Sequence, residues 1–282
     1  MEFKKLQVLK TELNIGLPSP VKLLHVTDTH IAYADPERPC GRQARFDGEI
    51  EDQTANYFEQ ALAYAKKNNL TMLHTGDLLD FLSQRSFDYI DEKLQDVDYI
   101  YAAGNHDYCH WVGEAKEDNA YKWENMKISA PHFKSNLWFD SRVIGGLNIV
   151  TLDNSYYRIS DGQLEMLRAE AAKGLPILLC MHNPLFTQNL ADLILSHNPN
   201  SDLAVVAAPR DYLYRYNDHR FLQQVPDDAT LRAVDYIKTE PMIKALITGH
   251  LHLNFEDTLE SGVPQIITHG TYAGYVRELT IL

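Results

Sequence analysis

Five short blocks of acidic, amide and imidazole side chains follow successive apolar runs in this 282-residue chain. They are Asp28-Thr29-His30, Gly76-Asp77, Gly104-Asn105-His106-Asp107, Met181-His182 and Gly249-His250-Leu251-His252. Carboxylate, imidazole and amide groups together suit a pair of borderline-hard divalent metal ions, and the blocks lack the thiolates that a structural zinc site favours. The pattern therefore predicts a metal centre with nitrogen and oxygen ligands.

Six apolar runs, five of which precede these blocks, have the length and the β-branched content of buried strands. They cover residues 21–27, 70–75, 97–102, 147–152, 177–181 and 243–248. In open α/β sheets, ligands gather at the carboxyl ends of strands, where side chains from several loops share one crevice. Asp28 and His30 are two residues apart, as are His250 and His252, and in an extended chain this spacing points both members of a pair to one side. We therefore expect each pair to bind one ion.

Helical spacing of apolar residues fills several gaps between the runs. One helix is marked by Ile50, Phe58, Ala61, Leu62 and Ala65, and another by Leu164, Leu167 and Ala171. The second helix is expected to begin at the capping-box spacing of residues 160–163 and to end at Gly174. The closing segments 255–260, 265–268 and 275–282 are expected to be antiparallel strands. Strands that alternate with helices predict an α/β fold with a mixed sheet.

The length suits a single domain over residues 1–282. The stretch at about 187–240 carries no metal-type motif and is too long for an ordinary connection, so we expect a lid or a substrate-selecting insertion there. Within it, Arg210 and Arg215 alternate with tyrosines and could bind phosphate, with a solvated surface as the alternative. His110, after the third block, could line the substrate pocket or simply pack in its loop.

The composition limits the partners of the protein. A formal net charge of -13 argues against non-specific binding to nucleic acid or to an anionic membrane. No segment approaches the roughly 20 apolar residues of a membrane span, and the first residues do not resemble a secretory signal, so we expect a cytoplasmic protein. Three widely spaced cysteines argue against a disulfide framework. A small phosphorylated substrate remains allowed, because bound dications reverse the local field.

Taken together and in this order, the blocks resemble those of the calcineurin-like metallophosphoesterase superfamily. Its pattern is Asp-x-His, Gly-Asp, Gly-Asn-His-(Asp/Glu), a later His and Gly-His-x-His, and the resemblance spans residues 28–252. It implies an α/β fold in which mixed β-sheets pack as a central β-sandwich flanked by helices, a four-layer α/β/β/α arrangement. It also implies two divalent or trivalent ions of manganese, iron or zinc.

The resemblance assigns roles to individual residues. It implies that one ion is held by Asp28, His30, Asp77 and His252, and the second by Asp77, Asn105, His182 and His250, so that Asp77 is shared. Two ions about 3.5 to 4 Å apart can clamp a phosphate and generate hydroxide near neutral pH, so metal-bound hydroxide is the implied nucleophile. His106 is the implied general acid. Asp80 is implied to orient His106, with capping of the following helix as an alternative of equal weight. Asp107 is expected to stabilise its own turn.

The substrate class is less narrowly indicated than the metal centre. Protein serine/threonine phosphatases of the superfamily continue the second block with Asp-Arg-Gly and end the third in Glu, whereas this chain has Asp80-Phe81-Leu82 and Asp107. The difference favours the bacterial phosphodiesterase branch that includes the class III cyclic-nucleotide phosphodiesterases. We therefore expect hydrolysis of a small nucleotide-like or other phosphodiester. The alternatives are a phosphomonoesterase, with a protein phosphatase as one case, and a non-catalytic metal-binding scaffold.

Overall fold

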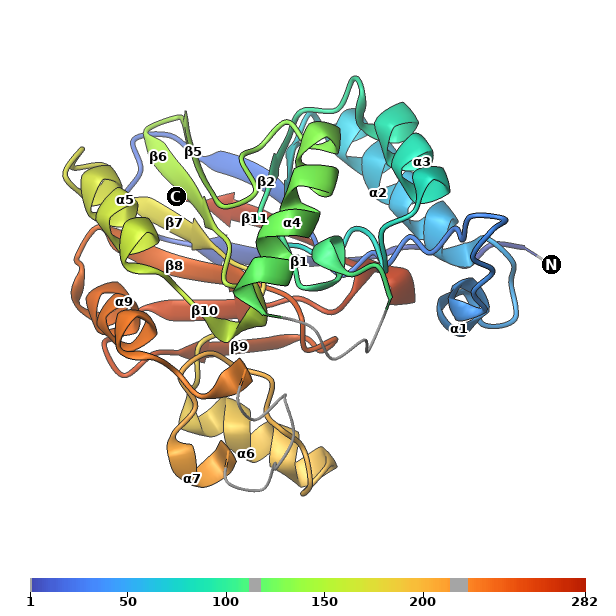
Figure 1. The fold of residues 1–282 in the computed structure, drawn as a ribbon. Coiled ribbons are helices and arrows are strands. Elements are labelled where there is room, and N and C mark those ends of the chain that lie inside the picture. Colours follow the sequence, from blue (N-terminus) through green and yellow to red (C-terminus); the bar gives the residue numbers. More distant parts are fainter. Residues whose placement is uncertain (1, 112–117, 214–222) are drawn as a thin grey trace.

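Two mixed β-sheets form the centre of the computed structural model, which describes residues 2–111, 118–213 and 223–282 (Figure 1). In spatial order, the first sheet contains β1 (Gln7–Leu13), β11 (Tyr275–Ile281), β2 (Val21–Val26), β3 (Thr71–His74) and β4 (Tyr99–Tyr101). The second contains β5 (Phe139–Ile144), β6 (Leu147–Leu152), β7 (Ile177–Cys180), β8 (Ile243–Thr248), β10 (Pro264–Ile267) and β9 (Phe255–Thr258).

The two sheets pack face to face because their central strands are apolar on both sides. Leu23 of β2 and Leu73 of β3 share one buried cluster with Ile149 and Leu178 of the other sheet. The next residue of β2, Leu24, faces the opposite way and belongs to a different cluster. Burial on both faces explains why these strands read as continuous apolar runs rather than as alternating patterns.

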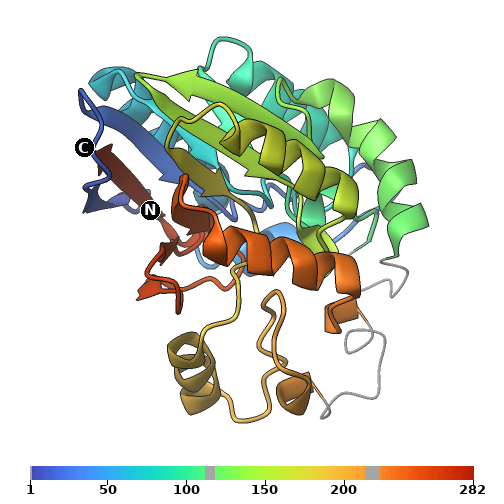
Figure 2. The same cartoon turned by 90° about the vertical axis from the view of Figure 1, so that its left-hand side faces the viewer.

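Helices cover the outer face of each sheet (Figure 1). The first sheet is covered by α2 (Gln53–Asn68), α3 (Gln84–Leu94) and α4 (Asn119–Ser129), whose Phe58, Ile90 and Met126 are buried in its outer cluster. The second sheet is covered by α5 (Asp161–Ala171) and α9 (Asp228–Thr239), which lie side by side in Figure 2. The predicted fold class, α/β with two mixed sheets flanked by helices, is confirmed.

The parallel strands bring the predicted ligand loops to one edge of the sandwich. β2, β3 and β4 are parallel neighbours, as are β6, β7 and β8, so the loops that follow them leave at corresponding ends. The prediction for the closing segments was only partly right. β9 and β10 are antiparallel, but β11 joins the other sheet, where it pairs antiparallel with β2 and parallel with β1.

Part of the segment 187–240 projects from the sandwich (Figure 1). α6 (Gln188–His197) and α7 (Arg210–Leu213) pack on each other through a small apolar cluster that includes Leu190, Leu213 and, at its border, Leu251 and Leu253. In contrast, α9 belongs to the helical layer over the second sheet, where Ile237 is buried. The lid role of the projecting part stays a prediction.

Short elements complete the described part of the chain. They are α1 (Arg42–Asp47) and the 3-10 helices η1 (His106–Tyr108), η2 (Ala130–His132), η3 (Ser155–Tyr157) and η4 (Thr271–Ala273). In the described ranges, no helix combines the length and the apolar composition that crossing a bilayer requires.

Candidate metal centre

Six of the seven predicted ligand side chains, all except that of Asn105, converge at the ends of β2, β3, β7 and β8. Three groups have potential ligand atoms within 4.8 Å of one another. The groups are Asp28 with His30 and His252, Asp77 with His182 and His250, and His30 with Asp80 and His106. Asp77 lies between the first two, since its Oδ2 is 3.1 Å from His182 Nε2 and 3.9 Å from His30 Nε2. The structure therefore contains buried His/Asp clusters that suit two neighbouring cations.

The backbone brings these residues together by turning, and not by staying extended. β2 ends at Val26 and β8 at Thr248, before the ligand pairs begin. The φ angles are left-handed in all five of the residues Asp28 (47°), His30 (54°), Asp77 (54°), His250 (68°) and His252 (52°). Such angles are uncommon in residues other than glycine and concentrate at functional sites. The expectation that an extended chain aligns each pair on one ion was wrong: Asp28 and His30 do meet in one group, but His250 and His252 belong to different groups.

Three glycines allow the loops to approach closely. A Cβ added to Gly104 would lie 2.2 Å from Asp77 Oδ1, and one added to Gly249 would lie 2.4 Å from Asp28 Oδ2. A Cβ on Gly76 would lie 2.5 Å from the backbone nitrogen of Gly104. Since carbon atoms do not approach oxygen or nitrogen this closely, a side chain at any of these positions would push the ligand loops apart.

The carboxylate of Asp107 joins two ligand loops. It accepts hydrogen bonds from the backbone N–H groups of Asp77 (3.0 Å), Leu79 (3.2 Å) and Gly104 (2.8 Å), and from the Tyr101 hydroxyl (2.6 Å). Burial, together with the charge of Asp77, raises the pKa of Asp107 to about 6. Asp107 therefore does more than stabilise its own turn, because it also fixes the backbone that presents Asp77.

Hydrogen bonds at the outer nitrogens orient the buried histidines. His182 Nδ1 lies 2.7 Å from the carbonyl oxygen of Thr75, which can only accept, so this nitrogen carries the proton. His30 Nδ1 donates in the same way to Asp80 Oδ1 at 3.1 Å. In both rings Nε2 is then the nitrogen that faces the cluster, and it can bind a metal ion once it carries no proton.

In His250 the roles of the two ring nitrogens are exchanged, because Nδ1 and not Nε2 faces the cluster. Its Nε2 lies 3.1 Å from the hydroxyl of Tyr157, and its Nδ1 lies 3.1 Å from His182 Nε2. His30 Nε2 similarly lies 3.1 Å from His252 Nε2. Two ring nitrogens at this distance can share at most one proton, and a cation between them satisfies both lone pairs.

Two buried oxygens support the same interpretation. Asp28 Oδ1 and Asn105 Oδ1 are buried and make no hydrogen bond in the described part of the chain. Asp28 Oδ1 lies 3.2 Å from His252 Nε2, 3.9 Å from His30 Nε2 and 4.0 Å from His182 Nε2. Buried polar oxygens without donors are costly, and a bound ion is one of the few explanations for them. The donor set therefore fits cations.

The buried acidic and imidazole groups of the site shift one another's pKa values. Burial raises the pKa of Asp28, but His252, His182 and His30 outweigh it, and the net pKa is well below the ordinary value. Burial lowers the pKa of His182, but Asp77 and Asp28 outweigh it and raise the pKa to about 9. Desolvation, with the charge of His182, lowers the pKa of His250 to about 3. In the protein without metal, a proton on His182 thus offsets part of the charge of the two carboxylates.

His106 and Asp80 form a pair beside the clusters. His106 Nδ1 lies 2.9 Å from the carbonyl oxygen of Asp80 and 3.2 Å from its Oδ1. Desolvation lowers the pKa of His106, but Asp77 and Asp80 raise it more, to about 10. The alternative that Asp80 caps the next helix is wrong, because the Ser83 side chain caps α3 by accepting from the N–H of Ser86.

Several residues at the site were not predicted from the sequence. Arg42 of α1 donates to both carboxylate oxygens of Asp80, and Phe46 of α1 stacks on His30 with ring centres 4.6 Å apart. Tyr272 lies 4.9 Å from the His252 ring, and Tyr157 contacts His250. These residues lie in short irregular segments without a periodic pattern, so only the structure identifies them.

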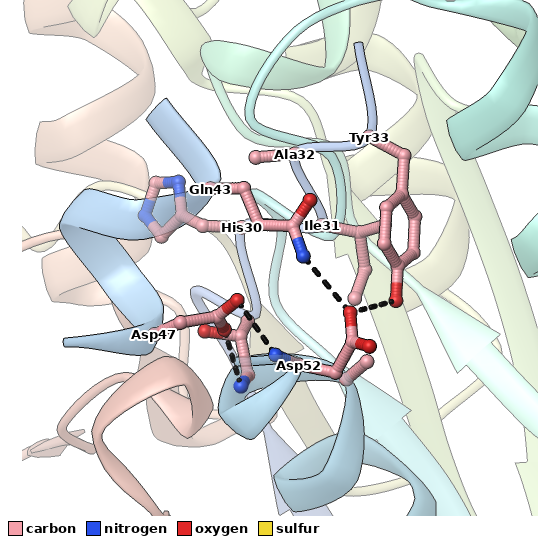
Figure 3. A pocket seen from close by; sticks show the side chains of 9 residues that line it. His30, Ile31, Ala32, Tyr33, Gln43, Asp47 and Asp52 are labelled. Atoms are coloured by element: carbon pink, nitrogen blue, oxygen red, sulfur yellow. Dashed lines mark hydrogen bonds between the residues drawn. The ribbon is translucent and has the colours of Figure 1, made fainter. Parts of the chain in front are cut away.

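A small cavity lies on the other side of His30 (Figure 3). Its volume is about 10 Å³, which is room for one water molecule at most. Asp47 organises its wall by accepting from the backbone N–H groups of Asp52 and Thr54, and Asp52 accepts from Tyr33 and Gln43. These hydrogen bonds stabilise the loop that follows the first ligand pair. The cavity itself is too small for a phosphoester.

The structure places two of the candidate substrate residues, His110 and Arg210. His110 lines a separate cleft of about 420 Å³ with Arg38 and Phe87, and its backbone N–H donates to the Tyr121 hydroxyl. Arg210 is exposed at the start of α7, in the projecting part. Arg215 lies outside the described residues. Their roles in substrate binding remain predictions.

Comparisons with known proteins agree with this geometry. A family model described as calcineurin-like phosphoesterase matches residues 21–254. The fold is similar to a dimetal phosphatase from Danio rerio, with a TM-score of 0.53 and 14% identity over 89% of this chain and 88% of that one. It is also similar to a putative 5'-nucleotidase from Staphylococcus aureus, with a TM-score of 0.50 and 11% identity over 90% of this chain and 49% of that one. No curated protein matches the sequence. At these identities the two structures show the fold alone.

Proposed function

Because the chain belongs to the calcineurin-like phosphoesterase family, we propose that this metal-dependent phosphoesterase uses two metal ions to hydrolyse a small phosphodiester. The observation that carries the proposal is the convergence of Asp28, Asp77, His182 and His252 around buried oxygens that make no hydrogen bond within the described ranges. Bound ions would offset the cost of these oxygens, so the arrangement supports metal binding, and turnover is what separates the enzyme from a metal-binding scaffold.

We assign one ion to Asp28, His30, Asp77 and His252, and the other to Asp77, Asn105, His182 and His250. The short distances from Asp77 Oδ2 to His182 Nε2 and His30 Nε2 support its shared role. The assignment of Asn105 is supported by its buried Oδ1, which has no hydrogen-bond partner among the described residues, and by its neighbour His106, whose N–H donates to Asp77 Oδ1 at 2.8 Å. Manganese, iron and zinc all suit this donor set. When bound, such a pair supplies positive charge for the phosphate and lowers the pKa of water.

His106 is the proposed acid that protonates the leaving oxygen. Its Nδ1 proton is directed at Asp80, which leaves Nε2 as the nitrogen that can deliver a proton to the substrate. The carboxylates of Asp77 and Asp80 raise its pKa, so the ring is protonated at neutral pH in the protein without metal. An imidazolium held in this way suits a reaction whose leaving alkoxide needs a proton.

The proposal of a diester substrate depends on the missing phosphatase arginine. Phe81 occupies that position, and its side chain is buried. The guanidinium that does lie beside Asp80, that of Arg42, uses its Nε and Nη2 to bind the Asp80 carboxylate. The half-buried rings of Phe46 and Tyr272 beside His30 and His252 could stack on a nucleobase or aryl group, which supports a nucleotide-like substrate.

The proposal extends to the partners and the compartment of the protein. The net charge of -13 supports a small phosphorylated substrate over non-specific binding to nucleic acid or to a membrane. Action in the cytoplasm, the compartment expected from the sequence, is part of the same proposal.

The proposal is tested by metal analysis and a substrate comparison. Protein loaded with Mn²⁺ should hydrolyse bis(p-nitrophenyl) phosphate faster than p-nitrophenyl phosphate, and a panel of cyclic nucleotides should then narrow the substrate. Much faster hydrolysis of the monoester would replace the diesterase by a phosphomonoesterase. A protein that binds two ions and cleaves neither ester nor any cyclic nucleotide would be the scaffold.

A further inference from the structure

The Asp80 carboxylate has a third partner that the proposed mechanism does not use. Arg42 begins α1, and its Nε and Nη2 donate to Asp80 Oδ2 at 2.6 Å and to Oδ1 at 3.1 Å. The Asp80 side chain is fully buried, while 21% of the Arg42 side chain is exposed. A two-point, charge-assisted bond to a buried carboxylate belongs to the stronger class of hydrogen bonds and sets the plane of the acceptor.

That plane decides which oxygen meets the histidines. Asp80 Oδ1 lies 3.1 Å from His30 Nδ1 and 3.2 Å from His106 Nδ1, so one oxygen contacts both rings. The terminal torsion of an aspartate is broad and roughly two-fold, so the side chain alone does not hold this orientation. A rotation about that torsion would withdraw Oδ1 from His30 and His106 together. Arg42 opposes the rotation because it binds both oxygens.

We propose that Arg42 is a positioning residue, which orients Asp80 so that one carboxylate oxygen holds a metal-binding histidine and the proton-donating histidine at once. The inference rests on the proposed function, because His30 and His106 have these roles only in a metallophosphoesterase. It adds a link between the ion assigned to His30 and the leaving-group proton on His106. It also assigns a task to α1, which comes from the segment between the first two sequence blocks.

A different role for Arg42 would be to fasten α1 to the body of the protein. α1 has six residues and no side-chain hydrogen bond at its N-cap, Gly41, so an anchor would be useful there. The chain offers a matched control in Arg45, which lies on the same helix with its guanidinium 5.9 Å from the centre of the Phe46 ring. Among the hydrogen bonds of the described residues, none joins Arg45 to Asp80.

The test compares Arg42→Gln, Arg42→Lys and Arg45→Gln in the full-length protein. Mn²⁺ affinity is measured by titration, and kcat and KM are measured at saturating Mn²⁺ on aryl methyl phosphates with phenol leaving groups of increasing pKa. For Arg42→Gln we expect Mn²⁺ affinity to fall about 10- to 100-fold, as is typical when a group behind a metal ligand is lost. We expect kcat to fall with KM unchanged, by about 10-fold or more for phenol and less for p-nitrophenol, because the better leaving group needs less protonation.

The control variant Arg45→Gln and the conservative variant Arg42→Lys separate a positioning role from other roles of Arg42. Arg45→Gln should match the wild type in Mn²⁺ affinity and in every rate. Arg42→Lys should fall between the wild type and Arg42→Gln, since an ammonium keeps the charge but cannot bind both oxygens in one plane. Arg42→Lys also serves as the test variant if Arg42→Gln does not fold.

Three results would overturn the inference. Equal losses for all leaving groups together with a lower melting temperature would make Arg42 an anchor of α1. A rise in KM with kcat unchanged would make it a substrate contact, and full activity in Arg42→Lys would mean that charge alone suffices. If the wild type hydrolysed no phosphoester, the proposed function would fail. The Mn²⁺ titration would then still decide whether Arg42 supports the site of His30.

Discussion

Replacing Gly104 by alanine should displace Asp77 and disable the metal centre. The added Cβ would lie 2.2 Å from Asp77 Oδ1 and 2.4 Å from the Asp77 nitrogen, whereas ordinary contact begins at 3.4 Å. The carboxylate or the backbone must therefore move by the difference, 1.2 Å. The same oxygen accepts the His106 N–H at 2.8 Å, so that hydrogen bond would be strained as well.

A displacement of about 1 Å in a catalytic group can reduce the rate by roughly 100-fold. Overpacking should also lower the free energy of unfolding by about 1–3 kcal/mol. We therefore expect Gly104→Ala to lose at least one ion at Mn²⁺ concentrations that saturate the wild type, and to lose about 100-fold in kcat/KM for bis(p-nitrophenyl) phosphate.

The assay combines metal stoichiometry by plasma mass spectrometry with steady-state kinetics and thermal unfolding. Gly41→Ala is the matched control, because a Cβ there meets no atom within 4 Å and φ at Gly41 is negative. It should retain both ions and nearly full activity. If Gly104→Ala kept two ions and wild-type kcat/KM, the close approach of the second and third ligand loops would not matter, and our account of the glycines would be wrong.

Four further outcomes follow from the same geometry. Asp77→Asn should weaken both ions together in a Mn²⁺ titration, because one carboxylate serves two sites, and loss of a single ion would argue against sharing. His106→Ala should keep both ions while kcat for an alkyl diester falls about 10²- to 10⁴-fold, and loss of metal would instead make His106 a ligand. Asp107→Asn should lower the free energy of unfolding by about 1–3 kcal/mol in urea denaturation, because the amide NH₂ would face a backbone N–H from which the carboxylate now accepts a hydrogen bond. An unchanged free energy of unfolding would count against the role of Asp107 in joining the loops. In the metal-free protein, the pKa of His106 is raised to about 10 and that of His182 to about 9. The contribution of these two protonated rings to stability is therefore complete below pH 6.5 and is lost as the pH rises towards 9 and 10. The melting temperature of the metal-free protein should fall across this pH range, and a rise would contradict the pKa shifts.

The central strands could be predicted from the sequence because both of their faces are buried. β6 and β8 have the predicted bounds, and β2, β3, β4 and β7 are each shorter than predicted by one to three residues. β1 and β5 were missed for the converse reason. Each lies at the edge of its sheet and is partly exposed, so charged residues such as Lys10 and Arg142 interrupt the apolar pattern.

Some helices could be predicted from the sequence and others could not. The capping box at Ser160 and Gln163 identified the start of α5 correctly, because both of its hydrogen bonds are local. α1 and its contacts could not be predicted, since the position of Arg42 depends on Asp80, which is 38 residues away. No local pattern encodes a hydrogen bond of that range.

The candidate site shows the same division between residue type and geometry. The sequence identified which residues converge, because ligand types follow strands that end at one edge of a sheet. It did not predict the left-handed turns at Asp28 and His250 or the role of Asp107 in joining two loops. Those features depend on contacts between loops that are distant in the chain.

The most direct test of the metal centre is anomalous X-ray diffraction from crystals grown with Mn²⁺. We expect two anomalous peaks about 3.5 to 4 Å apart. The Asp77 carboxylate should lie between them, with His30 and His252 beside one peak and His182 and His250 beside the other. A single peak, or two peaks that do not share Asp77, would contradict the dinuclear centre on which the proposed function depends.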